Sequence, residues 1–405
     1  MKLNHIYKSI ACGVLLAMTA TSCDLDYNPV DTYSDVTEGV NKTDEKPIFN
    51  SVQDVETSMV TLHKKFRDRQ EHWYVDKLLI GDAHSDNAYA GTTGAEVVPY
   101  ETNSIEGSNS VLKRDWDRFL GDIAVANRII VGCDQLKALS ESERGKYQSQ
   151  AKIFRAMVMF DMVRLWGNFP VITTVGGDIT EDNVEEMYPT YFPPQNTAEE
   201  AYAQIEKDLT EAVENPNTPT NDTSDKSILT KSVARAMLAK VYAEKPLRDY
   251  AKVIKYADEL AADGFDLVED FSDLWAYDTE KKDCRVRNTK EAILEAHFPP
   301  GSGNWCTWMF GRNLSNWDES FKWITPSRDL IRLYEEQGDT KRYNESVVWY
   351  DCGWSNYYPA DHYAFMYKCR SAFNSIIYLR YADILLLKAE AKIMGEAPDL
   401  NGAAD

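Results

Sequence analysis

Helical periodicity recurs along most of this chain and limits the folds that it can adopt. Apolar residues return every three or four positions, the spacing that places them on one face of an α-helix. The segments with this spacing are residues 52–69, 111–137, 141–166, 197–214, 227–245, 248–263, 326–337 and 376–395. Strand-like runs are few and short, at residues 167–174 and 292–298. The sequence therefore predicts a mainly α fold with minor β structure.

Residues 227–263 predict one helical hairpin, interrupted at Pro246. The pair resembles a tetratricopeptide unit at four of the positions that define that repeat: Leu238, Ala239, Tyr242 and Ala251. Lys255 and Asp258 stand where the repeat has Phe and Ala. We interpret the chain as a scaffold of degenerate tetratricopeptide-like hairpins, with an unrelated α fold as the alternative.

The first 22 residues resemble a bacterial export signal. Lys2 and Lys8 precede an apolar run at residues 10–18 that is too short to span a bilayer as a permanent helix. Ala-Thr-Ser then precedes Cys23, an ending that resembles the lipobox of bacterial lipoproteins. We expect residues 1–22 to be removed and Cys23 to carry the lipid that anchors the chain. An ordinary secreted protein with an incidental Cys is the alternative.

Charge and hydropathy exclude several partners. The 65 acidic residues outnumber the 44 basic ones, which gives a net charge of −21 and disfavours nucleic acid as a partner. After the export signal, no apolar stretch approaches the roughly 18 residues needed to span a membrane. Residues 23–50 are polar and predict a flexible tether between the lipid and the fold.

Five cysteines follow Cys23, and at most two disulfides can join them in an oxidising compartment. They are Cys133, Cys284, Cys306, Cys352 and Cys369. Sequence alone leaves their pairing open. No Cys-x-x-Cys or His-Glu-x-x-His spacing occurs, so we expect neither a metal nor a cofactor.

Two segments resemble SusD/RagB-type outer-membrane lipoproteins. In residues 150–170 an Arg155-Ala156 helix leads into Trp166-Gly-Asn-Phe-Pro170, and in residues 378–391 Arg380-Tyr-Ala-Asp383 precedes an Ala-Glu-Ala ending. The resemblance implies a surface lipoprotein of Bacteroidota, facing the cell exterior, that captures glycan and delivers it to a SusC-like TonB-dependent transporter. The motifs themselves are interpreted as helix packing rather than chemistry.

The family's pattern usually continues beyond the Ala-Glu-Ala helix, whereas this sequence stops at Asp405. We therefore expect residues 51–405 to form a SusD-like helical domain whose C-terminal part is missing. Residues 264–325 and 338–375 are expected to be loop-rich inserts. The apolar face of the last long helix, with Leu385, Leu386 and Ile393, is expected to be exposed.

Aromatic loops supply the candidate ligand-binding residues, because sugar rings present apolar faces edged with hydroxyl groups. The long loop at residues 298–323 offers Asn304, Trp305, Trp308, Arg312 and Trp317. The polar loop at residues 81–89 offers Asp86, Asn87 and Tyr89. A rival aromatic segment contains Trp349, Trp354, Tyr357, Tyr358 and Tyr363. The alternative is that these aromatic side chains only fill the core.

An enzyme is the main competing class, and a surface glycoside hydrolase would need two opposed carboxylates. Acidic pairs such as Asp82 with Asp86 or Asp115 with Asp117 occur by chance in so acidic a chain. No Gly-x-Ser-x-Gly, phosphate loop or dinucleotide fingerprint appears. We therefore expect a binding protein and not an enzyme. Peptide capture, hydrolysis of glycan and a helical-repeat adaptor role remain the alternatives.

Overall fold

The computed structural model describes residues 47–91, 96–177, 179, 183–281, 283–298, 303–312 and 322–404. The predicted export signal, the predicted anchor Cys23, almost all of the predicted tether and the candidate Trp317 lie outside these residues. Within them, no helix is both long enough and apolar enough to cross a membrane.

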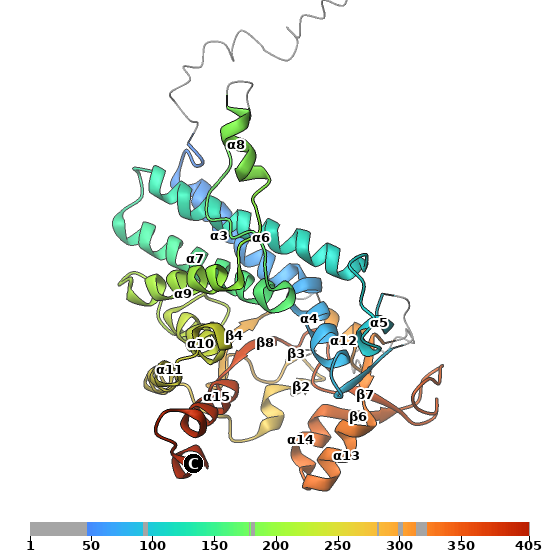
Figure 1. Cartoon of the computed structure of the whole chain (residues 1–405). Coiled ribbons are helices and arrows are strands. Elements are labelled where there is room, and N and C mark those ends of the chain that lie inside the picture. The colour runs from blue at the N-terminus through green and yellow to red at the C-terminus, as the bar shows by residue number, and fades with distance from the viewer. Residues whose placement is uncertain are drawn as a thin grey trace, which may run out of the picture. The chain divides into compact units, whose positions relative to one another are not determined.

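Four long helices build the first half of the fold (Figure 1). They are α3 (Val52–Asp68), α6 (Ser110–Gln135), α7 (Glu141–Trp166) and α9 (Ala198–Glu214). Helix α7 packs against both α6 and α9. From Tyr147 to Val163 its side chains are buried on nearly every face, which places this helix at the centre of the main hydrophobic core.

A helical hairpin and the last long helix extend this layer. Helix α10 (Lys231–Ala243) packs against α11 (Tyr250–Ala262), and α15 (Tyr381–Met394) packs on both. The Tyr242 and Tyr256 rings stack across the hairpin with centroids 6.1 Å apart. The prediction of a mainly helical chain containing hairpins is confirmed.

Local capping explains why several helix ends were predictable. The Thr197 hydroxyl accepts a hydrogen bond from the Glu200 N–H, and the Glu200 carboxylate accepts one from the Thr197 N–H. Asn215 ends α9 and Gly264, with φ of +92°, follows α11. A backbone at this positive φ favours glycine, which suits the chain reversal after α11.

Two sequence predictions were wrong. Residues 167–174 contain no strand and make only an isolated bridge from Phe169 to Asn196. The predicted helix at 376–395 begins instead with strand β8 (Ile376–Arg380), because these residues pair antiparallel with β4 (Ala292–Ala296). Branched and aromatic side chains at 376–378 suit a strand, and the pairing partner lies too far away in the sequence to be seen locally.

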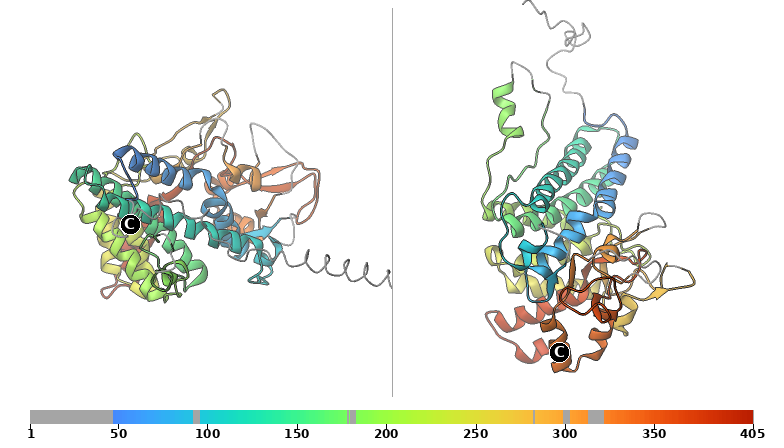
Figure 2. Two further views of the ribbon diagram at one scale, coloured as in Figure 1. Left: turned by 90° about the horizontal axis from the view of Figure 1, so that it is seen from above. Right: turned by 90° about the vertical axis from the view of Figure 1, so that its right-hand side faces the viewer.

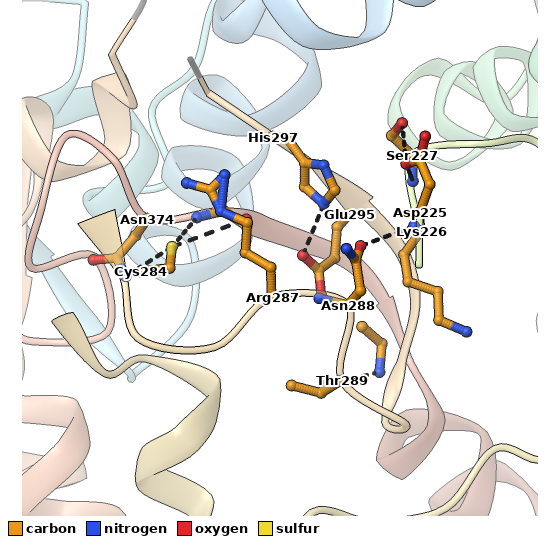
Figure 3. A network of polar contacts seen from close by, with 12 residues as sticks. Asp225, Lys226, Ser227, Cys284, Arg287, Asn288, Thr289, Glu295, His297 and Asn374 are labelled. Carbon is orange, nitrogen blue, oxygen red and sulfur yellow. Dashed lines mark hydrogen bonds and ion pairs between the residues drawn. The ribbon is translucent and has the colours of Figure 1, made fainter. Parts of the chain in front are cut away.

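The buried carboxylate of Glu295 sits in β4 and is satisfied by a polar network (Figure 3). It accepts hydrogen bonds from the Asn288 N–H (3.1 Å) and pairs with His297 Nε2 (3.2 Å). The Lys226 N–H in turn donates to Asn288 Oδ1 (2.9 Å). This network fixes the segment before α10 against the β4–β8 pair.

The remaining described strands form three further antiparallel pairs. Strand β1 (Ala88–Ala90) pairs with β5 (Ile324–Pro326), β2 (Tyr277–Asp278) with β3 (Asp283–Cys284), and β6 (Val347–Tyr350) with β7 (Tyr363–Met366). The β6–β7 pair lies beside α13 (Arg328–Gln337) and α14 (Thr340–Ser346) (Figure 1).

Short helical segments complete the described part of the chain. They are η2 (Glu71–Val75), α4 (Asp76–Leu78), η3 (Leu79–Ala83), α5 (Val98–Glu101), α8 (Val184–Tyr191), η4 (Lys245–Leu247), η5 (Phe271–Leu274), α12 (Trp305–Met309) and α16 (Leu400–Ala404). Helix α8 stands away from the α7–α9 layer in Figure 1 and in the right-hand view of Figure 2.

Candidate functional site

The polar loop at residues 81–89 meets the chain that follows the long loop at residues 298–323 through the β1–β5 pair. Tyr89 lies opposite Thr325 in this pair. The backbone carbonyls of Asp86 and Asn87 accept hydrogen bonds from the Ser327 hydroxyl and the Ser327 N–H, respectively. The polar loop is therefore held by the start of α13, and the side chains of Asp86 and Asn87 are left exposed.

Aromatic side chains gather beside β1 and form what we call the aromatic cluster: Tyr89, Trp349, Tyr357, Tyr358 and His362. The Tyr89 and Tyr357 rings stack with centroids 4.4 Å apart and an interplanar angle of 18°. The Trp349 and His362 rings stack at 4.2 Å and 4°. Tyr358 meets Trp349 edge to face. The polar loop and the rival aromatic segment thus contribute to one site.

Hydrogen bonds hold the tyrosine rings in place. The Tyr357 hydroxyl donates to Glu101 Oε2 (2.7 Å), which also accepts from the Ala90 N–H (2.7 Å). The Tyr358 hydroxyl donates to the Pro326 carbonyl (2.8 Å). Burial raises the pKa of both hydroxyls, and the Glu101 carboxylate raises that of Tyr357 further. Both groups therefore stay protonated and act as donors at neutral pH.

Arg328 adds a cation at the edge of the aromatic cluster. Its guanidinium lies 4.8 Å from the Tyr358 ring centroid and 6.0 Å from that of Tyr89. The same group donates to the Tyr357 carbonyl, and the Arg328 N–H donates to the Tyr89 hydroxyl (3.1 Å). Arg328 is exposed, so its planar group is accessible beside the rings.

A small hydrophobic core of its own supports the aromatic cluster. Its buried members are Ile331, Val347, Trp354, Tyr358, Tyr363, Ala364 and Phe365. Tyr89, Trp349 and Tyr357 are only partly buried and pack on this core from outside. Trp354, Tyr358 and Tyr363 therefore act mainly as support, while Tyr89, Trp349 and Tyr357 remain partly accessible to solvent.

The long loop at residues 298–323 is the other candidate segment, and it leads into β5 from the N-terminal side. Trp305 and Trp308 on α12 are 37% and 49% exposed. The Lys322 ammonium donates to the Trp308 carbonyl (2.8 Å), just before β5 begins. Both indoles are accessible, as a sugar-binding platform requires.

Asn304 and Arg312 flank this helix and are buried. The Asn304 side chain caps α12 by accepting from the Cys306 N–H (2.9 Å) and donates to the Asn374 carbonyl (3.0 Å). The Arg312 guanidinium lies 3.9 Å from the Tyr350 ring centroid. Both side chains orient the segment, so Trp305 and Trp308 are its stronger candidates for ligand contact.

Sequence reasoning missed three members of this region: Glu101, Arg328 and His362. Their roles depend on contacts with residues distant in the chain, which no local pattern encodes. His362 lies within the rival aromatic segment, next to Tyr363, and that aromatic neighbourhood was the available signal.

Of the acidic pairs that occur by chance in the sequence, Asp115 and Asp117 lie in different environments. Asp115 is buried and bonded to Asp76, whereas Asp117 is exposed and pairs with Lys113 (2.6 Å). No cluster of three or more His, Cys, Asp or Glu side chains suited to a metal occurs among the described residues.

Comparison with known proteins decides the family. The sequence model described as SusD-like, "Starch-binding associating with outer membrane", matches residues 33–243, just over half of the 405 residues. The chain belongs to the SusD-like family. A SusD-like protein of Bacteroides ovatus is 24% identical over 355 residues, covering 83% of this chain. The chain spans 58% of the length of that curated relative.

Solved structures share the fold. Surface glycan-binding protein A from Bacteroides fluxus matches 87% of this SusD-like chain and 80% of its own, with a TM-score of 0.69 and 19% identity. A laminarin-binding SusD-like protein matches 88% of this chain and 83% of its own (TM-score 0.66, 20% identity). Surface glycan-binding protein A from Bacteroides thetaiotaomicron, solved with laminarihexaose, matches 85% and 79%, respectively (TM-score 0.68, 16% identity). The predicted scaffold of tetratricopeptide-like helices is confirmed.

Proposed function

We propose that this SusD-like chain captures glycan at the cell surface through the aromatic cluster. The observation that carries the proposal is the stacked Tyr89–Tyr357 pair, with Arg328 at its edge and a dedicated core behind it. Rings fixed in this way offer apolar faces to a sugar, and the neighbouring Asp86 and Asn87 side chains offer hydrogen-bond partners for its hydroxyl groups. In this proposal, Trp305 and Trp308 on α12 add two further aromatic side chains to the glycan-binding surface.

Family membership supports the cellular setting. The family description places its members in association with the outer membrane and with starch. We propose that lipid on Cys23 anchors the chain, that residues 23–50 tether it, and that a SusC-like TonB-dependent transporter receives the glycan. A variant that still binds glycan but no longer co-purifies with the transporter would locate the surface that contacts the transporter.

Native gels containing single polysaccharides test glycan capture. A panel that includes laminarin should reveal one polysaccharide that retards the protein. Tyr89→Ala and Tyr357→Ala should each weaken the affinity measured from that retardation by about tenfold, a loss comparable to the ~1–3 kcal/mol that an aromatic side chain contributes by stacking on one nucleobase. Tyr188→Ala is the matched control, because Tyr188 on α8 is 57% exposed and lies outside the aromatic cluster.

Two outcomes would contradict the proposal. Equal retardation of Tyr89→Ala, Tyr357→Ala and wild type, with wild-type melting temperatures, would remove the aromatic cluster from the site. Sugars released in the gel samples would instead support the hydrolase alternative. Binding of peptides without binding of any polysaccharide would identify the chain as a peptide-capturing family member.

A further inference from the structure

Two segments that are distant in sequence run side by side next to the candidate site, residues 303–312 and residues 366–374. Three contacts join them: the Asn304 N–H with the Ala372 carbonyl (2.7 Å), the Thr307 hydroxyl with the Ser371 carbonyl (2.7 Å), and the backbone bridge between Gly311 and Met366. These contacts place Cys306 of the first segment and Cys369 of the second in the same part of the fold.

Cys306 and Cys369 are those two cysteines, and each lies near enough to the other to shift its pKa. Cys306 is fully buried and Cys369 is partly buried. The backbones also approach closely here, since a Cβ on Gly311 would lie 2.1 Å from the Cys369 carbonyl oxygen. Neighbouring backbones with one cysteine on each are the starting arrangement that a disulfide requires.

The other described cysteines that follow the anchor contact different groups. Cys284 Sγ accepts from the Ser375 N–H (3.2 Å) and lies beside Asn374 (Figure 3). Cys352 Sγ donates to the Trp354 carbonyl (3.1 Å). Cys133 is buried within α6. Position therefore singles out Cys306 and Cys369 as the candidate pair among these cysteines.

We propose that Cys306 and Cys369 form a disulfide in the exported protein. The two thiols lose two protons and two electrons, and the oxidant is a disulfide of the thiol-exchange class. One thiolate attacks that disulfide and displaces a thiol, and the second cysteine then attacks the mixed disulfide and displaces the other thiol. The proposal depends on export only because the compartment outside the cytosol supplies the disulfide oxidant.

The environment of the two sulfurs favours Cys369 as the attacking thiolate. The hydrogen bond from Cys306 lowers the pKa of Cys369, and the charges of Lys368 and Arg370 lower it further against the effect of burial. The same hydrogen bond, together with burial, raises the pKa of Cys306. The thiol with the lower pKa is also the one that is partly exposed.

The crosslink would restrain the candidate site. Residues between the two cysteines include α13, α14, β6 and β7, and thus most of the aromatic cluster and its supporting core. The bond also pins α12, with Trp305 and Trp308, to the chain leaving β7. Closing so long a loop restricts the unfolded chain strongly.

Peptide mapping of the full chain tests the disulfide. Reduced protein is refolded in a mixture of oxidised and reduced glutathione, unfolded without reductant, alkylated and digested. The expected result is a crosslinked peptide pair containing Cys306 and Cys369, with alkylated Cys133, Cys284 and Cys352. Complete alkylation of Cys306 and Cys369 would overturn the proposal.

Thermal melting provides an independent readout. Adding reductant should lower the melting temperature of wild type and of the control Cys284→Ser by roughly 5 °C. Cys306→Ser, which cannot form the bond, should melt at the same temperature with and without reductant. An equal response of Cys306→Ser and wild type to reductant would contradict the proposal.

Discussion

At the scale of single residues, the family motif at Arg155 is a buried ion pair. The guanidinium donates two hydrogen bonds to Asp208 (2.7 and 2.8 Å) and one to Asn127 (2.7 Å), and both charged side chains are at least 96% buried. The interpretation of this motif as packing is confirmed. Arg380 pairs with Glu291 (2.6 Å), but its side chain is partly exposed.

Removing Arg155 alone should therefore destabilise the fold strongly. Arg155→Leu leaves the Asp208 carboxylate buried without its counter-charge, which should lower the free energy of unfolding by about 3–5 kcal/mol in urea titrations. The double variant with Asp208→Leu should recover part of that loss. Lys152→Ala is the matched control on the same helix, because its pair with Glu211 is partly exposed and contributes about 1 kcal/mol or less. Equal losses for Arg155→Leu and Lys152→Ala would refute the argument.

A second buried charge group predicts a pH effect. Burial, and next the charge of Asp76, raise the pKa of Asp115 from 3.8 to about 9, although Arg114 opposes this. The folded state then binds a proton that the unfolded state releases, so stability is fully present below about pH 4 and falls as the pH rises to about 9. Asp115→Asn should remove this slope, up to ~1.4 kcal/mol per pH unit. Urea titrations across this range measure it against Asp117→Asn, whose carboxylate is exposed; identical slopes in all three proteins would disprove the shift.

At the scale of elements, local signals predicted the helices and long-range pairing determined the site. The caps at Thr197 and Asn215 and the apolar stripes of α3, α6 and α9 are encoded within a few residues, so their bounds were predictable. The pairing of Tyr89 with Thr325 joins residues 236 positions apart (325 minus 89), and no local pattern specifies it. The aromatic residues were recognisable from sequence as two candidate groups, but their convergence depends on that pairing.

The packing of α15 makes a prediction about a small residue. Ala391 is fully buried where α15 meets α11, whereas Leu386 on the same helix is 71% exposed. Ala391→Leu should force the helices apart and lower the free energy of unfolding by about 1–3 kcal/mol. Leu386→Ala should change it by roughly 0.5 kcal/mol or less. Chemical denaturation of both variants is the measurement. A more stable Ala391→Leu protein would show that the interface can accommodate a larger side chain at this position.

At the scale of the whole molecule, the net charge of −21 sets the electrostatic background for any ligand. Neutral glycan bound by ring stacking should show almost unchanged affinity as salt rises from about 0.01 M to about 1 M, although the Debye length falls from ~30 to ~3 Å. A polysaccharide rich in uronic acids should be repelled at low salt and bind better as screening increases.

Arg328 is the local exception to this acidic field, and it makes the salt experiment decisive about ligand class. If its cation beside Tyr358 governs binding, an anionic polysaccharide will bind most tightly at low salt, and Arg328→Gln will abolish that salt dependence. If the field of the whole chain governs binding, an anionic polysaccharide will bind more tightly as salt rises, and Arg328→Gln will leave that salt dependence unchanged. We expect the second result, because a single exposed guanidinium is screened as strongly as the acidic groups of the chain, which outnumber the basic ones 65 to 44. Isothermal titration of wild type and Arg328→Gln at both extremes of salt separates the two cases.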